Sequence, residues 1–71
     1  MRVNFSDFFL VQAQNSPTVI LYFRTSGEPV FVKSYSEEWI ESVVDPMAWI
    51  ESDVRNFCKH EGLDLYDPGR S

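Results

Sequence analysis

Apolar, aromatic and β-branched residues form three runs in the first half of the chain, at residues 8–13, 18–24 and 30–35. Short stretches rich in Asn, Ser, Gly and Pro separate these runs and are typical of tight turns. In the second run Val19, Leu21 and Phe23 share one face, because side chains alternate along a strand. The pattern predicts a three-stranded antiparallel meander.

The first run allows two interpretations, and the assignment of faces in the third run assumes strict alternation. Residues 5–14 also fit an amphipathic helix that begins after Asn4, and so short a run does not distinguish a helix from a strand. Its helical stripe would consist of Phe5, Phe8, Phe9 and Gln12. In the third run, alternation places Val30 and Val32 opposite Phe31, Lys33 and Tyr35.

The second half of the chain has the three-to-four-residue spacing of helices. Ser34 and Glu37 have the spacing of a capping box, which predicts where the first helix begins. Its apolar face would consist of Trp39, Ile40, Val43 and Val44.

A second helix is predicted over residues 46–61. Asp45 is a favourable N-cap, and Pro46 is tolerated at the first helical position because its missing N–H would be unpaired there. Lys59 and His60 suit the negative end of the helix dipole, and Gly62 is placed to end the helix. The buried stripe would consist of Met47, Ile50, Val54, Phe57 and Cys58.

Together these elements predict one small α+β domain over residues 1–71, with two layers. The meander comes first, and the two helices pack on one face of the sheet. Residues 63–68 alternate apolar and acidic side chains, which suggests a short C-terminal edge strand. Residues 1–4 and 68–71 are expected to be loose termini.

Size and composition limit the class of protein. A chain of 71 residues buries only about 60% of its unfolded surface, but six Phe, three Tyr and two Trp enrich its core. The single cysteine excludes an internal disulfide, which favours a reducing cytoplasm. Asp7 interrupts the apolar start, so we expect no signal peptide, and no apolar run has the length of a membrane span.

Charge is unevenly distributed along the chain. Eleven acidic and six basic residues give a net charge of −5, which disfavours direct binding to nucleic acid or to an anionic membrane. No basic residue lies between Lys33 and Arg55. That segment contains the acidic residues Glu37, Glu38, Glu41, Asp45, Glu51 and Asp53. This acidic segment is either a solvated face or a docking surface for a basic partner.

The tetrapeptide WIES occurs twice, at residues 39–42 and 49–52. On the predicted helices Trp39 faces the core, whereas Trp49 lies on the polar side with Asp53, Asn56 and His60. Two interpretations follow for Trp49: a neighbouring element covers it, or it is an anchor that contacts a partner, since Trp is enriched at interface hot spots.

No arrangement of residues indicates catalysis, a cofactor or a metal. Cys58 and His60 are the only residues of their types and point about 200° apart on a helix, so they form no dyad. Two such ligands do not make a zinc site. The carboxylates lie on exposed faces, where nothing raises a pKa for acid–base chemistry. We therefore expect no enzyme, no cofactor and no metal.

The remaining hypotheses concern binding. In size and charge the chain resembles small acidic proteins of phages and mobile elements that bind and block host factors, although no motif carries the resemblance. The leading hypothesis is a cytoplasmic inhibitor or regulator that sterically occludes a partner protein. Its expected contact residues are Trp49, Asp53, Asn56, His60, Glu37, Glu38 and Glu41. The alternatives are an acidic mimic of nucleic acid that blocks a DNA- or RNA-binding protein, and a homodimeric assembly subunit that buries Trp49.

Overall fold

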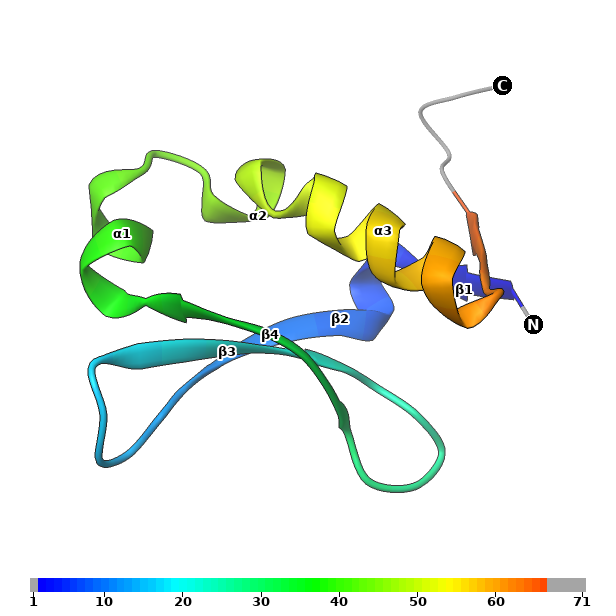
Figure 1. Cartoon of the computed structure of the whole chain (residues 1–71), viewed down its shortest axis with the longest axis horizontal. Helices are drawn as coiled ribbons and strands as arrows, with labels where there is room; N and C mark the ends of the chain where they lie inside the picture. The colour runs from blue at the N-terminus through cyan, green and yellow to red at the C-terminus, as the bar shows by residue number, and fades with distance from the viewer. Residues whose placement is uncertain (1, 67–71) are drawn as a thin grey trace.

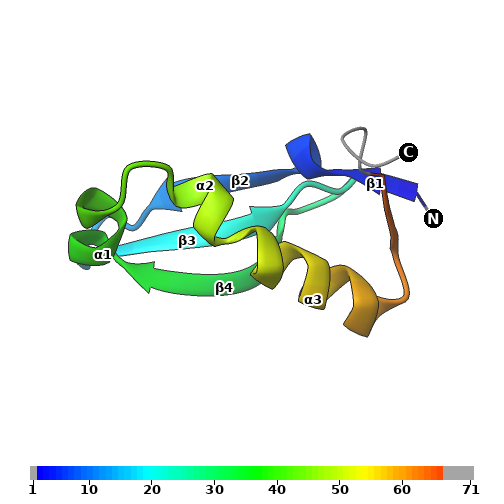
Figure 2. The ribbon, with the colours of Figure 1, turned by 90° about the horizontal axis from the view of Figure 1, so that it is seen from above.

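A computed structural model describes residues 2–66, and Figure 1 shows the course of the chain. The elements follow in this order: β1 (Arg2–Asn4), the 3-10 helix η1 (Phe5–Asp7), β2 (Phe8–Gln12), β3 (Thr18–Phe23), β4 (Val30–Ser36), α1 (Glu37–Ser42), α2 (Pro46–Trp49), α3 (Glu51–Glu61) and β5 (Asp64–Tyr66). Strands β2, β3 and β4 form an antiparallel sheet in that order, so the predicted meander is confirmed. The helices lie over one face of this sheet (Figure 2), which makes the predicted two-layer α+β architecture.

The ambiguity at residues 5–14 is resolved in favour of a strand preceded by one helical turn. The Asn4 backbone N–H donates to the Asp7 carboxylate at 2.8 Å, which holds the turn η1. From Phe8 the chain is extended and pairs with β3, with Phe8 opposite Phe23. Burying both rings in the core outweighs the helical stripe that the same residues could form.

A β-bulge in β4 makes the strictly alternating prediction wrong for this strand. Leu21 pairs with Lys33 while Tyr22 pairs with Phe31, so Val32 is the extra residue. Two consecutive residues at a bulge oppose one partner, which shifts the alternation by one position. Lys33 and Tyr35 therefore share the helix-covered face, and Phe31 lies on the other face.

The N-terminal and C-terminal segments pair with one another. β1 and β5 form a separate parallel pair, with Val3 opposite Leu65 (Figure 1). The prediction of a loose segment at residues 1–4 is therefore wrong for residues 2–4, because Val3 is buried in the core. The predicted C-terminal strand exists, but it pairs with β1 instead of extending the meander. The predicted loose end at residues 68–71 lies outside the described residues.

Helix α1 begins and ends at different residues from those predicted. Ser36 is its N-cap and accepts a hydrogen bond from the Trp39 backbone N–H at 3.1 Å, so the prediction of Ser34 as the cap is wrong. β4 extends through Ser36, and sheet pairing with Ile20 occupies Ser34. The helix ends at Ser42, which leaves Val44 fully exposed instead of on an apolar face.

The predicted helix over residues 46–61 consists of two segments, α2 and α3, that meet at Ile50. Ile50 has φ −89° and ψ 1°, but its N–H still donates to the Pro46 carbonyl and its carbonyl still accepts from Val54. Pro46 starts the first segment as predicted, although the Asp45 side chain makes no capping hydrogen bond. Gly62 ends the second segment with a left-handed φ of 71°, which confirms its predicted role.

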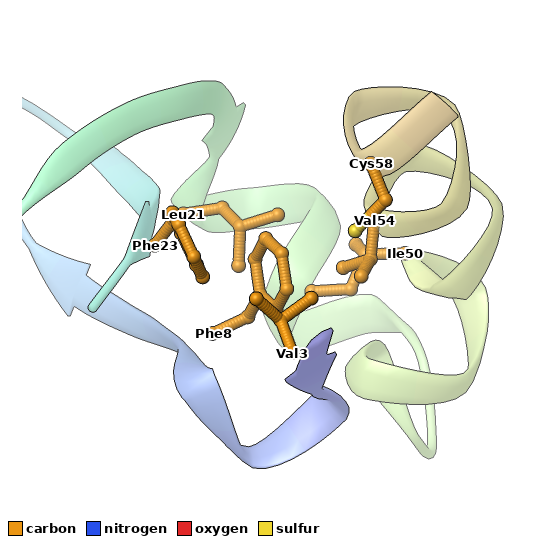
Figure 3. Packing of buried hydrophobic residues seen from close by; sticks show 7 residues of the cluster. All are labelled: Val3, Phe8, Leu21, Phe23, Ile50, Val54 and Cys58. Atoms are coloured by element: carbon orange, nitrogen blue, oxygen red, sulfur yellow. The ribbon is translucent and has the colours of Figure 1, made fainter. Parts of the chain in front are cut away.

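The core lies between the sheet and α3 (Figure 3). Its buried side chains are Val3, Phe8, Leu21, Phe23, Ile50, Val54 and Cys58. Phe57 contributes a partly buried ring whose centroid lies 5.9 Å from that of Phe8 and 5.8 Å from that of Phe23. The predicted stripe on residues 46–61 is confirmed, with Met47 and Phe57 at its partly buried margins.

Candidate protein-binding surface

Trp49 is the last residue of α2 and is 66% exposed. The next residue, Ile50, is fully buried, and consecutive helical side chains point about 100° apart. Because the Ile50 side chain packs in the core, the Trp49 side chain points away from the core. The interpretation that another element covers Trp49 is wrong in this structure.

Asn56 and His60 lie on one side of α3. Positions 53, 56 and 60 fall within about 60° of one another around this helix, whereas Trp49 belongs to α2, which a turn at Ile50 separates from α3. Asn56 is exposed, and the His60 side chain is exposed with its Nε2 3.8 Å from the Glu61 carboxylate. We call Trp49, Asn56 and His60 the Trp49 surface.

Asp53 shares this side of α3 but is engaged within the protein. Its Oδ2 accepts a hydrogen bond from the Tyr35 hydroxyl at 2.7 Å, and its Oδ1 lies 3.3 Å from Lys33 Nζ. Its side chain is only 24% exposed. Asp53 therefore joins α3 to β4, and its role beside the Trp49 surface is to hold the helix in place.

Tyr35 connects this contact to the first WIES copy. Burial, together with the hydrogen bond and negative charge of Asp53, raises the pKa of the Tyr35 hydroxyl well above its ordinary value. The Tyr35 ring stacks on Trp39, with centroids 5.5 Å apart and an interplanar angle of 21°. Trp39 is thus partly buried against the core, and Trp49 is not, which confirms the predicted difference between the two copies.

The acidic candidates divide into paired and exposed groups. Glu37 accepts a hydrogen bond from Gln12 Nε2 at 2.8 Å, so it ties α1 to the sheet. Glu38 and Glu41 are exposed on α1 and supply negative charge to the helical layer. Glu51 pairs with Arg55, four residues further along α3, at 3.2 Å.

A depression of about 280 Å³ lies between the helices α2 and α3 and the two ends of the described chain. Its lining residues are Phe5, Asp45, Met47, Ala48, Glu51, Arg55, Leu65 and Tyr66. It forms where η1 and β5 meet the helices, so it depends on the pairing of the two ends of the chain. No local pattern in the sequence indicates this contact.

Cys58 and His60 lie in different environments, as their spacing predicts. Cys58 is buried, and burial raises the pKa of its thiol while the nearby Arg55 opposes the shift. Within residues 2–66, no three His, Cys, Asp or Glu side chains are grouped closely enough to hold a metal ion.

Comparison of the chain with models of protein families, with curated proteins and with solved structures found no match. Over residues 2–66, none of the helices combines the length and the apolar character that crossing a membrane requires.

Proposed function

We propose that this protein binds another protein through its helical layer and occludes a functional surface of that partner. The supporting observation is the 66% exposure of Trp49. A domain of this size gains stability from each large apolar ring that it buries, and Trp49 contributes little of this stability while it is exposed. Trp is also among the residues most enriched at interface hot spots.

The exposed polar residues of the helical layer fit an interface in which Trp49 is the apolar centre and the polar residues are the rim. Asn56 offers a hydrogen-bonding amide, and His60 offers an imidazole at the end of α3. Glu38 and Glu41 add negative charge that would attract a partner with a basic surface. Asp53 and Glu37 would act indirectly, because both are hydrogen-bonded within the fold.

Binding without catalysis is the activity that these side chains support best. The thiol of Cys58 is buried in the core, whereas the imidazole of His60 is exposed on another side of α3. A nucleophile and a base would have to lie within hydrogen-bond distance of one another. We accordingly propose a cytoplasmic regulator or inhibitor, comparable in kind to the small acidic proteins of phages and mobile elements.

The acidic-mimic alternative draws on the exposed Glu38 and Glu41. This alternative has less support than the proposal that rests on Trp49. The carboxylates of Glu37, Glu51 and Asp53 already have partners within the chain. A mimic would bind through charge, so its affinity would fall steeply with salt.

The proposal is tested by affinity capture from a cell lysate with three proteins: the wild type, Trp49→Ala and Val30→Thr. Val30 is 41% exposed on β4, so its variant controls for the loss of an exposed apolar side chain outside the helices. We expect a specific partner to be retained by the wild type and by Val30→Thr, and lost with Trp49→Ala, at both low and moderate salt.

Other results would favour the alternatives. A partner retained by all three proteins but released by moderate salt would favour the acidic mimic. A partner retained by Trp49→Ala through the salt wash would contradict the role of Trp49.

A further inference from the structure

The sheet β2-β3-β4 has one face that no described element covers. Figure 1 shows the helices on one side of this sheet and only the hairpin loops beyond the other side. Register and alternation place the following residues on the uncovered face, which we call the outer face: Phe9, Val11, Thr18, Ile20, Tyr22, Phe31, Ser34 and Ser36.

Large apolar side chains form a continuous row across the outer face. Phe9 pairs with Tyr22, and Tyr22 pairs with Phe31, so aromatic residues span all three strands. The Phe9 and Tyr22 rings stack with centroids 5.8 Å apart. Val11 pairs with Ile20 beside them. A contiguous apolar patch of this kind marks a contact surface more often than scattered exposed residues do.

None of the strand residues on the outer face is charged, and the Arg24 guanidinium lies beside the Phe9 ring just beyond the end of β3. The strands β2, β3 and β4 contain no Asp or Glu, and their single charged residue, Lys33, lies on the helix-covered face against Asp53. The acidic residues of α1 and α3 all belong to the helical layer. Two copies of a chain with a net charge of −5 repel one another, and that repulsion is least when their helical layers are farthest apart.

We infer that the outer face binds the outer face of a second copy of this chain. Packing the two sheets face to face would put the two helical layers on opposite outer sides of the dimer. It would also bring uncharged apolar rows together, as in a sandwich of two sheets about 10 Å apart. The Trp49 surface of each copy would stay free, so this dimer is compatible with the proposed function and independent of it.

A row of aromatic rings on a sheet can also stack nucleic-acid bases. Such platforms rely on a positively charged groove that follows the phosphates. Here Arg24, whose guanidinium lies 5.3 Å from the Phe9 ring centroid, is the cation seen beside the row in the described residues. One guanidinium beside a chain of net charge −5 favours a second copy over a polyanion.

The size of the face predicts a weak dimer. Three strands about 4.8 Å apart and about six residues long give a face of roughly 300 Å² per copy. Stable complexes usually bury more than about 1,000 Å² in total, so this contact would be a small and weak protein–protein interface. We expect a dissociation constant in the micromolar range, on the order of 10–100 μM.

The test is sedimentation of the wild type, Phe31→Thr and Val30→Thr over a range of concentrations up to about tenfold above the expected constant. Val30 is the matched control, because it is 41% exposed, adjacent in β4 and paired with Phe23 on the helix-covered face. We expect reversible dimers that Phe31→Thr weakens at least tenfold and Val30→Thr leaves within about twofold. Added salt should strengthen the dimer, since it screens the like charges.

A second variant, Val11→Lys, places a charge on the outer face at an exposed edge-strand position and should also abolish the dimer. Circular dichroism would check that each variant is folded. A wild type that stays monomeric at the highest concentration would overturn the inference, as would a dimer that Trp49→Ala disrupts and Val11→Lys does not. Saturable binding of a single-stranded oligonucleotide that Phe31→Thr abolishes would equally overturn it.

Discussion

Removing the Asp53 carboxylate should destabilise the fold. The hydrogen bond from the Tyr35 hydroxyl is 2.7 Å long and partly buried, and hydrogen bonds to charged groups contribute about 1.5–3 kcal/mol. The ion pair with Lys33 adds at most about 1 kcal/mol, because the Lys33 side chain is 55% exposed and solvent screens the pair. We expect Asp53→Ala to lower the free energy of unfolding by about 2–3 kcal/mol.

In a domain of this size, that loss is large. A change of 1 kcal/mol shifts the melting temperature by about 4–8 °C, so the melting temperature of Asp53→Ala should fall by roughly 10–20 °C. Urea unfolding and thermal unfolding, both followed by circular dichroism, measure the two quantities.

Three further variants separate the contributions. Asp53→Asn keeps an acceptor for the Tyr35 hydroxyl and should lose about 1 kcal/mol. Lys33→Met should lose less than that, since it removes only the exposed ion pair. Glu51→Ala removes the pair with Arg55 on the other side of α3 and should cost less than about 0.5 kcal/mol. If Asp53→Ala is no more destabilising than Glu51→Ala, then Asp53 does not join α3 to β4.

Three other changes have defined outcomes. The free energy of unfolding should fall as pH rises above 10.0, because the unfolded chain releases the Tyr35 proton there while the folded chain retains it; in Tyr35→Phe, measured by urea unfolding across that range, the fall should be smaller. Ile50→Ala should cost about 2–5 kcal/mol by the same assay, because Ile50 is fully buried; a cost below 1 kcal/mol would contradict its place in the core. Gly62→Ala should cost about 1–2 kcal/mol from its left-handed backbone alone, since no atom lies within 4 Å of an added Cβ; an unchanged melting temperature would refute this.

The pattern of apolar positions predicts most of the fold, because the burial of apolar side chains determines how the strands and helices pack. Val19, Leu21 and Phe23 alternate and are buried. Leu21 and Phe23 pack in one core with Ile50, Val54 and Cys58 of the helical stripe. These are local periodicities that the sequence displays directly. The same periodicity predicts that Trp39 and Trp49 face different ways.

The errors arise where contacts distant in sequence decide the structure. The pairing of β1 with β5 joins residues at the two ends of the chain, and no local signal indicates it. The bulge at Val32 changes which residues of β4 face the helices, and so brings Lys33 and Tyr35 to Asp53. Helical spacing therefore predicts that Asp53 lies off the buried stripe of α3, but it does not predict the contacts of Asp53 with β4.

The candidate protein-binding surface also depends partly on local spacing and partly on contacts distant in sequence. Helical spacing predicts that Trp49, Asn56 and His60 lie on one side, but whether a neighbouring element covers Trp49 depends on the ends of α1 and β5. Because α1 ends at Ser42 and β5 pairs with β1, the tertiary structure leaves Trp49 exposed.

The central claim is that Trp49 anchors a protein partner. Its most direct test is the affinity of a captured and purified partner for the wild type and for Trp49→Ala, measured by titration calorimetry with the melting temperature of each protein as a check on folding. We predict that Trp49→Ala weakens binding by about 2 kcal/mol, or roughly 30-fold, while stability changes by less than about 0.5 kcal/mol. An unchanged affinity, or a large loss of stability without loss of binding, would contradict the account.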